Sequence, residues 1–205
     1  MSTTFWAENQ VGGPYITAEE SSTALAERAF AFPRLYDLMP VNLPGEVVLD
    51  YGCGPGHDTL LFCMNAAGHV FYYDISPLAL DIVDMRLEMH GLENHASPVE
   101  LHTIPRVDHI HCAGVLQHTE DPMWILKFFR RVLKQNGEAR VSIYDGDRSK
   151  HSKSKVPITI WWKETEFLYM AHMAGFDAEQ TGHYECSSPW RPDCYMACYR
   201  LTPKR

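Results

Sequence analysis

The sequence predicts an α/β fold: a doubly wound, mostly parallel sheet of seven strands, with helices on both faces and an antiparallel C-terminal hairpin. Three observations predict it. From Glu46 onward, short apolar runs alternate with longer amphipathic stretches, which is the pattern of βαβ units. A glycine-rich turn directly follows the first apolar run. The last two apolar runs have no helical pattern between them, so we expect them to pair as a hairpin.

The first strand is expected over Val47–Asp50, an apolar run that enters the glycine turn. A helix is expected over His57–Ala67, with Gly68 in the left-handed conformation that often follows a helix end. The second strand is expected over His69–Asp74, which completes a βαβ unit with a right-handed crossover.

The next helix has clear start and stop signals. Ser76 suits the N-cap, Pro77 suits the first helical position, and Gly91 suits the position just past the end. The third and fourth strands are expected over Val99–Ile104 and Val107–Cys112. The link between these two strands is so short that little or no helix fits there.

The same cap-then-proline signal recurs at Asp121 and Pro122. The helix that starts there is expected to end at Asn136 and Gly137. The fifth strand is expected over Ala139–Asp145, directly after this helix.

A basic polar loop over Arg148–Lys155 follows the fifth strand. It is either a solvated connection or a clamp for a phosphate or carboxylate group of a substrate. A further helix is expected over Lys163–Ala174, with Gly175 behind it. The closing hairpin is then expected from Asp177–Tyr184 and Cys194–Leu201.

The whole chain, residues 1–205, is expected to form a single domain, because no linker divides it and its length suffices for one core. Residues 1–42 are interpreted as an N-terminal helical cap or lid. Within this segment, Thr17–Met39 is mainly helical with a break near Pro33. Trp6 precedes that helix, where a lid would contact the acceptor. The alternative is a docked helix that only completes the core.

The composition is that of an ordinary globular protein, with 45% hydrophobic and 21% charged residues. The formal net charge of -8 gives no field that would hold a phosphate backbone, so bulk nucleic-acid binding is not expected. No run approaches the roughly 18 apolar residues of a membrane span, and the N-terminus lacks a basic start followed by an apolar run. We therefore expect a cytoplasmic protein without membrane contact.

Six cysteines are present, without a C-x-x-C pair and without close disulfide-like spacing. We expect most of them to be reduced and buried. Cys194, Met196 and Cys198 alternate onto one face of the last strand, where core packing explains them better than a metal site. His109 and His111 share a face of the fourth strand, but no third ligand has suggestive spacing, so no metal is expected.

The glycine turn is the expected ligand site, since open parallel sheets bind ligands beyond the carboxyl ends of their strands. Gly52, Gly54 and Gly56 let a ligand approach the backbone closely. Asp74 ends the second strand, where a carboxylate accepts hydrogen bonds from ribose hydroxyls. Asp50, two residues before the first glycine, would repel a pyrophosphate but attract an ammonium or sulfonium group. These features favour a sulfonium nucleoside over a dinucleotide.

The run D-Y-G-C-G-P-G, followed by Y-D-I-S and then HCAGVLQHTEDP, resembles the class I S-adenosylmethionine-dependent methyltransferases, and in particular their small-molecule branch. The resemblance covers Leu43 to about Leu201. It implies S-adenosylmethionine as cofactor and S-adenosylhomocysteine as product. The cofactor-binding residues that it implies are Asp50, Gly52, Cys53, Gly54, Gly56, Asp74, Ile75, Ala113 and Gly114.

Two regions depart from the pattern of that family. Gln117 stands where small-molecule methyltransferases often have the first of two histidines, so only His118 carries over. The region of the third strand offers no aligned acidic residue for the adenine amino group, and His102 or Thr103 would replace it.

Methyl transfer is an in-line displacement, and alignment of the acceptor supplies most of the acceleration. If the acceptor must lose a proton, His118 at the exit of the fourth strand is the expected general base. The alternative is a histidine that only shapes the pocket. Tyr144, at the end of the fifth strand, is the second candidate catalytic residue, with ordinary strand packing as its alternative. His57 either contacts the cofactor carboxylate or only starts its helix.

The expected function is methyl transfer to an oxygen, nitrogen or carbon nucleophile of a small molecule, by a monomer or homodimer. The alternative is an S-adenosylmethionine-binding protein, or an enzyme of another reaction type, on the same fold. A nicotinamide-dependent dehydrogenase is disfavoured by Asp50 and by the spacing of the glycines.

Overall fold

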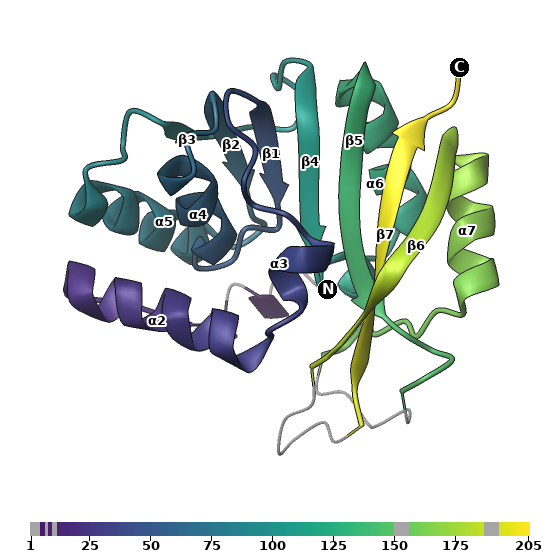
Figure 1. Cartoon of the computed structure of the whole chain (residues 1–205), viewed down its shortest axis with the longest axis horizontal. Coiled ribbons are helices and arrows are strands. Elements are labelled where there is room, and N and C mark those ends of the chain that lie inside the picture. The colour runs from purple at the N-terminus through teal and green to yellow at the C-terminus, as the bar shows by residue number, and fades with distance from the viewer. Residues whose placement is uncertain (1–4, 7, 10–11, 150–155, 187–192) are drawn as a thin grey trace.

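The computed structural model describes residues 5–6, 8–9, 12–149, 156–186 and 193–205 of the chain. Its centre is a seven-stranded sheet in the order β3-β2-β1-β4-β5-β7-β6 (Figure 1). The strands are β1 (Val47–Tyr51), β2 (His69–Tyr73), β3 (Ala96–Pro98), β4 (Val107–Ala113), β5 (Leu133–Tyr144), β6 (Phe176–Glu185) and β7 (Tyr195–Pro203). The helices are α2 (Ala18–Ala31), α3 (Leu35–Leu38), α4 (His57–Met64), α5 (Pro77–His90), α6 (Pro122–Val132) and α7 (Glu164–Met173), with a 3-10 turn η1 (Leu116–His118).

The body of the sheet is parallel. β1 pairs with β2 and β4, β2 pairs with β3, and β4 pairs with β5, all in parallel. β7 lies antiparallel between β5 and β6. The predicted fold class is therefore confirmed. Because the parallel strands run in one direction, their carboxyl ends meet at one edge of the sheet, the lower edge in Figure 1.

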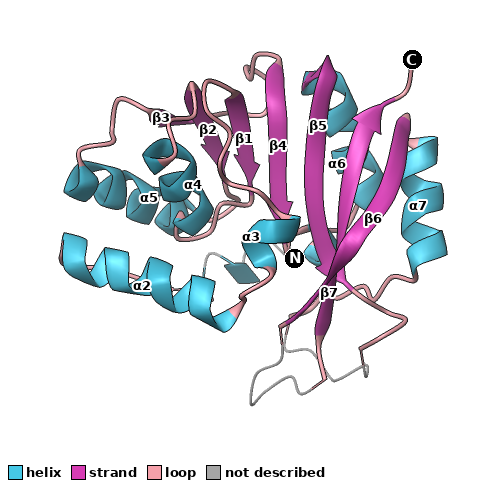
Figure 2. Ribbon diagram, viewed as in Figure 1, coloured by secondary structure: helices cyan, strands magenta, loops and turns pink. Residues whose placement is uncertain are grey.

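Helices cover both faces of the sheet (Figure 2). One core lies between the sheet and the helices α6 and α7, and its buried residues include Leu126, Phe129 and Phe167. The other core lies between the sheet and the helices α4 and α5, and its buried residues include Phe62 and Val83. Both cores are mainly apolar layers, which is what a doubly wound sheet requires.

The end of α4 differs from the prediction. The helix begins at His57 as predicted but ends already at Met64. The left-handed residue that follows is Ala66, at φ 60°, and not Gly68. A Cβ on Gly68 would lie 2.6 Å from the carbonyl oxygen of Gly45. A glycine is therefore needed there because two backbone segments approach closely, and not because a helix ends.

The start and end signals of α5 are confirmed. The Ser76 side chain accepts a hydrogen bond from the amide of Ala79, and Gly91 follows the helix at φ 67°. The start of α6 is confirmed in the same way, since the Asp121 side chain accepts a hydrogen bond from the amide of Trp124.

The end of α6 was predicted too late. The helix stops at Val132, and Leu133 already pairs with Val107 of β4. The chain has thus entered the sheet before it reaches Gly137. A Cβ on Gly137 would collide with the carbonyl oxygen of Asp108, so this glycine permits the close approach of β5 to β4.

The third strand was also misplaced. It is β3 over Ala96–Pro98, whereas the predicted run Val99–Ile104 forms turns. β3 is an edge strand, where a proline such as Pro98 is tolerated, and the amide of Val99 donates a last hydrogen bond to the carbonyl oxygen of Tyr72 at 3.1 Å. The link from β3 to β4 contains no helix, as predicted. Its apolar side chains instead pack against the core that α6 covers.

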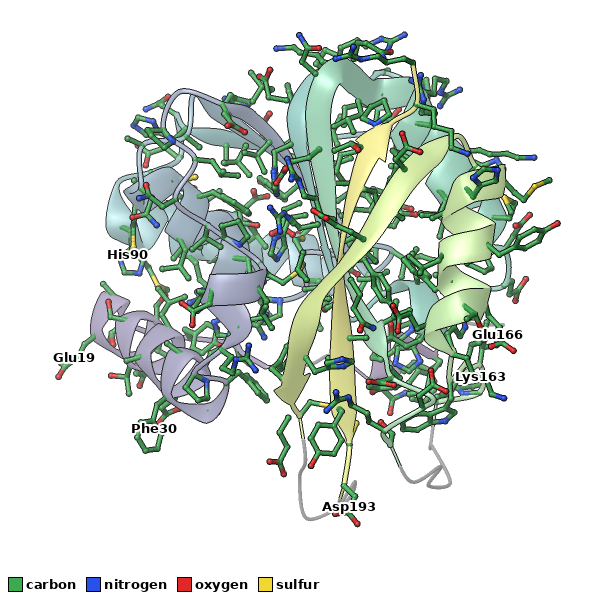
Figure 3. All side chains as sticks on the ribbon, turned by 45° about the vertical axis from the view of Figure 1, so that its right-hand side comes forward. Glu19, Phe30, His90, Lys163, Glu166 and Asp193 are labelled. Atoms are coloured by element: carbon green, nitrogen blue, oxygen red, sulfur yellow. The ribbon has the colours of Figure 1, made fainter. Side chains whose placement is uncertain are left out.

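The N-terminal helices and the last helix follow the sequence signals. α2 and α3 are separated near Pro33, and α2 contacts α5 (Figure 1). At the start of α7, the Glu166 side chain accepts a hydrogen bond from the amide of Lys163 at 3.0 Å; both residues are labelled in Figure 3. Gly175 follows that helix at φ 92°. Among the described residues, no helix is long and apolar enough to cross a membrane.

Candidate active site

The glycine turn between β1 and α4 is built from left-handed residues. Gly52, Gly54 and Gly56 have φ angles of 76°, 52° and 76°, which side chains with a Cβ rarely adopt. A Cβ on Gly56 would lie 2.8 Å from the Val83 side chain, and one on Gly52 would collide with Val115. A Cβ on Gly54 would meet no atom of the described residues within 4 Å. The open side of the turn is therefore at Gly54.

A cavity of about 280 Å³ opens beside this turn, at the carboxyl ends of the parallel strands. Eight of the nine predicted cofactor-binding residues line it, and so does His118. These eight are Asp50, Gly52, Cys53, Gly54, Asp74, Ile75, Ala113 and Gly114. The ninth, Gly56, is the N-cap of α4 and packs on α5 instead. Tyr144 does not line the cavity.

The Asp74 carboxylate is fixed by two backbone amides. Its Oδ2 accepts a hydrogen bond from Gly54 at 2.9 Å, and its Oδ1 accepts one from Ser76 at 2.9 Å. Burial raises the pKa of Asp74 above its ordinary value, and the backbone amides oppose this. Each carboxylate oxygen has a second lone pair, so the group retains acceptor capacity for hydroxyl groups of a ligand.

Asp50 lies deeper, at 2% exposure. Its Oδ2 accepts a hydrogen bond from the hydroxyl of Thr59 at 2.6 Å. Burial raises the pKa of Asp50 to about 6, with a smaller contribution in the same direction from the nearby Asp58. A carboxylate with this pKa is energetically poor in an empty site and gains from a neighbouring cation.

A buried ionic network beside Asp50 was not predicted from the sequence. Arg28 of α2 forms an ion pair with Asp58 at 2.9 Å, and the hydroxyl of Tyr36 donates to the same carboxylate at 3.0 Å. His111 contacts Asp58 from β4 at 3.1 Å. Burial alone would raise the pKa of Asp58, but Arg28 and His111 hold it well below its ordinary value. Asp58 is therefore ionised.

Arg28 is the cation of this network that also lines the cavity, and its side chain is 26% exposed. Its Nη2 donates to Asp58, and its Nε donates to the hydroxyl of Tyr36 at 3.3 Å. A guanidinium has five N–H groups, so this arrangement leaves donors for an anionic ligand group. No sequence pattern marks Arg28, because only the packing of α2 beside α5, at the carboxyl edge of the sheet, brings it to the turn.

The N-terminal segment is attached to the turn through Arg86 of α5, which is fully buried. Its Nη1 donates to the carbonyl oxygen of Pro55 at 2.6 Å, and its Nη2 donates to that of Ser21 at 3.0 Å. The guanidinium also lies 4.4 Å from the ring centroid of Tyr15. Tyr15 in turn contacts His57, which lines the cavity.

His57 is neutral at physiological pH. Burial lowers its pKa to about 4, and Arg86 and Arg28 add to this shift. Its ring Nε2 lies 3.4 Å from the hydroxyl of Tyr15. The ring therefore contributes a hydrogen-bonding group and no charge to this side of the cavity.

His118 stands at the opposite wall of the cavity. Its Nδ1 lies 2.9 Å from the carbonyl oxygen of Ile158, and because a carbonyl only accepts, Nδ1 carries the hydrogen. The neutral ring therefore has its lone pair at Nε2. The rings of Trp6 and Tyr144 both pack edge-to-face with that of His118, each with its centroid 5.4 Å away. Tyr144 is buried and stacks on Trp161.

Several other predicted positions do not line the cavity. Gln117 is buried beside it but is not among the residues that line it, and His102 and Thr103 lie in an exposed turn. His109 is buried next to Phe62. The basic loop falls within residues 150–155, outside the described part of the chain, apart from its first two positions.

Comparison with known proteins gives one consistent family. The family model described as a methyltransferase domain matches residues 42–183. A tRNA U34 carboxymethyltransferase of Colwellia psychrerythraea is 30% identical over 116 residues, which are 53% of this chain and 35% of that protein. An uncharacterized 37.1 kDa protein in a transposon of Streptomyces fradiae is 37% identical over 111 residues, 51% of this chain and 32% of that protein. The chain thus spans about a third of the length of these relatives.

Solved structures share the fold. Magnesium protoporphyrin IX methyltransferase from Synechocystis, crystallised with bound S-adenosylmethionine, superposes with a TM-score of 0.68 at 16% identity, over 98% of this chain and 97% of that chain. The N-terminal domain of EvdMO1, crystallised with S-adenosylhomocysteine, has a TM-score of 0.61 at 20% identity, over 88% of this chain and 83% of that chain. The [4+2]-cyclase SpnF has a TM-score of 0.67 at 16% identity, over 96% of this chain and 86% of that chain.

The residues at the cavity fit a sulfonium nucleoside. The turn is open at Gly54, where a ligand can lie against the backbone. Asp74 offers carboxylate oxygens that suit ribose hydroxyls. Arg28 and Asp50 offer a cation and an anion on the same side of the cavity, which suits a ligand that carries both a carboxylate and an ammonium group.

Proposed function

The chain belongs to the methyltransferase-domain family whose model matches residues 42–183, and we propose that it methylates a small molecule. It is a class I S-adenosylmethionine-dependent enzyme, with S-adenosylmethionine as cofactor and S-adenosylhomocysteine as product. The observation that carries the proposal on the acceptor is the size of the cavity. Its described lining runs from Asp74 at the cofactor turn to Trp6 and His118, and its volume of about 280 Å³ is on the scale of a small-molecule site.

The cofactor contacts are assigned residue by residue. We assign the ribose hydroxyls to Asp74 and one face of the adenine to Ile75, which is 38% exposed beside the cavity. We assign the ammonium group to Asp50 and the carboxylate to Arg28, since opposite charges attract strongly where water is scarce. Ala113 and Gly114 have little or no side chain and leave space for the methyl end.

The bound cofactor supplies the chemistry, which is an electrophilic methyl carbon on a good leaving group. The chain has to bring an acceptor into line behind that carbon and to exclude water. Effective molarities of well-oriented pairs correspond to about 7 to 11 kcal/mol, so alignment alone accounts for a large part of the acceleration. The enclosing residues Trp6, Val115 and Thr119 provide this alignment in our proposal.

His118 is proposed as general base for acceptors that lose a proton. Its Nδ1 hydrogen is committed to Ile158, so Nε2 is the atom that accepts the proton. The aromatic neighbours Trp6 and Tyr144 hold the ring in one orientation. Tyr144 is proposed to act through His118, since its ring packs against that of His118 and is not part of the cavity lining. For a carbon or nitrogen acceptor that needs no deprotonation, His118 would only shape the pocket.

A macromolecular acceptor is the second candidate, because one relative is a tRNA carboxymethyltransferase. The net charge of -8 disfavours it, since binding to a polyphosphate backbone depends on neutralising basic residues. An enzyme of another reaction type on this fold is the third candidate, as the likeness to a [4+2]-cyclase illustrates.

The experiment that tests the proposal uses cofactor with a labelled methyl group. The purified chain is incubated with this cofactor and, in separate arms, with a metabolite extract and with total tRNA. Label in a new small molecule supports the proposal. Label only in tRNA would contradict it and favour the macromolecular acceptor. Calorimetric titration with S-adenosylhomocysteine, and with a reduced nicotinamide cofactor as control, establishes that the preparation is competent to bind.

A further inference from the structure

Two cysteines stand opposite each other directly beyond the last paired residues of β6 and β7. Glu185 and Tyr195 are the last paired residues of the two strands, and Cys186 and Cys194 form the next position outward. The amide of Cys186 donates a hydrogen bond to the carbonyl oxygen of Cys194 at 2.9 Å. Their Sγ atoms lie 2.7 Å apart. The hairpin thus holds two thiols in direct contact.

The spacing of these cysteines in the sequence gave no hint of this pairing. They are separated by seven residues, and only the register of the hairpin makes them neighbours. Directly opposed positions on antiparallel strands have Cα separations of about 4.5 to 5.5 Å, which is within the range that a disulfide spans. The backbone is therefore already arranged for a cross-link without a change of fold.

The remaining cysteines provide a contrast. Cys53, Cys63, Cys112 and Cys198 are buried within the core clusters. Cys186 is partly exposed, and Cys194 is only 1% exposed. A soluble oxidant thus reaches Cys186 first. The buried Cys194 is then in position to attack a mixed disulfide formed at the Cys186 sulfur.

We propose that Cys186 and Cys194 are a modification site, at which the chain forms a reversible intramolecular disulfide. In the first step, the Cys186 thiolate attacks glutathione disulfide and releases one glutathione thiolate. In the second step, the Cys194 thiolate attacks the Cys186 sulfur of this mixed disulfide and releases the second glutathione. The two cysteines lose two protons and two electrons, and the electrons reduce glutathione disulfide to two glutathione molecules.

The site lies behind the cavity wall. Cys194 shares a buried cluster with Met196 and Tyr144. The Met196 methyl group lies 3.8 Å from the position that a Cβ on Gly114 would take, and Gly114 lines the cavity. Figure 3 shows Asp193 at the outer end of β7, and Figure 1 shows this hairpin extending beyond the carboxyl ends of β4 and β5. A bond at Cys194 therefore fixes the strand that supports the acceptor side of the site.

The rate of this reaction depends on pH. The hydrogen bond to Cys194 and burial raise the pKa of the Cys186 thiol well above its ordinary value. Because the thiolate is the attacking species, oxidation is slow near neutral pH and faster in alkali. The assay is therefore run at mildly alkaline pH.

The test counts thiols in the folded chain of residues 1–205. After incubation with glutathione disulfide, or with reduced glutathione as control, the protein is denatured in a maleimide and its mass is measured. The reduced chain takes six labels, one for each cysteine, and the oxidised chain is expected to take two fewer. Peptide mapping should find the link between Cys186 and Cys194. Six labels in both samples, a stable glutathione adduct, or a link between other cysteines would overturn the proposal.

Single substitutions sharpen the result. Cys194→Ser should abolish the internal bond and leave a glutathione adduct on Cys186, whereas Cys186→Ser should leave neither. Cys198→Ala, within β7, is the matched control and should still lose two labels on oxidation. Should Cys194→Ser fail to fold, Cys186→Ser decides the question alone, since its side chain is partly exposed. The thiol count does not depend on methyl transfer, so this proposal and the proposed function fail separately.

Discussion

The amide nitrogen of Gly54 donates a hydrogen bond to Oδ2 of Asp74 at 2.9 Å, and this contact joins the glycine turn to the end of the second strand. The two parts of the proposed cofactor site, which are separated by a helix in the sequence, are thereby held as one unit. In this proposal the Asp74 carboxylate both fixes the turn and offers oxygens to the ligand. Its replacement should affect binding through both roles.

Asp74→Ala should weaken binding of S-adenosylhomocysteine by about 30- to 100-fold. Hydrogen bonds to a charged group contribute about 1.5 to 3 kcal/mol each. In the variant, water can replace the carboxylate as acceptor for the ligand hydroxyls, and this recovers part of the lost binding free energy. Calorimetric titration measures the change. Asp81→Ala, at an exposed position on α5, is the control and should bind as the wild type does. Equal affinity of Asp74→Ala and wild type would remove Asp74 from the cofactor site.

Asp50→Asn should stabilise the cofactor-free protein while it weakens cofactor binding. The pKa of Asp50 is raised to about 6, so the folded state retains its proton where the unfolded state has lost it. Ionisation of Asp50 therefore lowers the free energy of unfolding of the wild type as pH rises from about 4 to 6, and this loss is complete above that range. At pH 7 the substitution should raise the free energy of unfolding by about 1 to 3 kcal/mol. Urea unfolding at pH 5 and pH 8 measures it, and a gain independent of pH would contradict this explanation.

Arg28→Met should lower both stability and cofactor affinity. It leaves the ionised Asp58 buried without its cationic partner, and removal of one partner from a buried pair costs about 3 to 5 kcal/mol. We expect the lower part of that range, because Arg28 is partly exposed. Arg28→Lys should recover part of the stability. The matched control is Lys127→Met on the exposed face of α6. Unchanged S-adenosylhomocysteine affinity in Arg28→Met would show that the cofactor carboxylate binds elsewhere.

His118→Ala should reduce kcat by about 100-fold or more for an acceptor that loses a proton, as is typical for removal of a general base. Binding of S-adenosylhomocysteine should change by no more than about threefold, since His118 is assigned to the acceptor. Tyr144→Phe retains the ring that packs on His118 and should keep most of the activity. Full turnover in His118→Ala would restrict this residue to shaping the pocket.

Trp6→Ala should raise the KM for the acceptor by about tenfold, because buried aromatic contacts often contribute more than 1 kcal/mol to binding. Cofactor affinity should stay close to that of the wild type. Phe30→Ala is the control, since Phe30 is exposed on α2 (Figure 3). Deletion of residues 1–17 removes Tyr15 as well and should also weaken cofactor binding. Unchanged activity and affinity after this deletion would mean that the segment is not a lid.

Local sequence signals predicted those parts of the structure that depend on local chemistry. The caps at Ser76 and Asp121 are of this kind, and so is the glycine turn with Asp74. Glycines were harder to interpret. Gly68 and Gly137 look like helix ends in the sequence, but both are required by the close approach of distant backbone segments. A single sequence does not distinguish these two reasons for a glycine.

The ionic network around Asp58 could not be predicted from local patterns. Arg28, Tyr36 and His111 come from three different elements; His111 opens the HCAGVLQHTEDP motif, but nothing in the sequence connects it with Arg28 or Tyr36. The packing of α2 and α3 at the carboxyl edge of the sheet brings them together. The cysteine pair beyond the last paired residues of β6 and β7 has the same origin, because its contact depends on the register of these strands.

The most direct test of small-molecule methylation is to quantify both reaction products, S-adenosylhomocysteine and the methylated compound. The purified chain is given S-adenosylmethionine with a deuterated methyl group and the small-molecule fraction of an extract, and both products are quantified by mass spectrometry. We expect one S-adenosylhomocysteine for each molecule of a new deuterium-labelled compound, and much less of both products with Asp74→Ala when the cofactor concentration is below its saturating value. If S-adenosylhomocysteine binds to the chain but no labelled small molecule forms, the proposed function is contradicted.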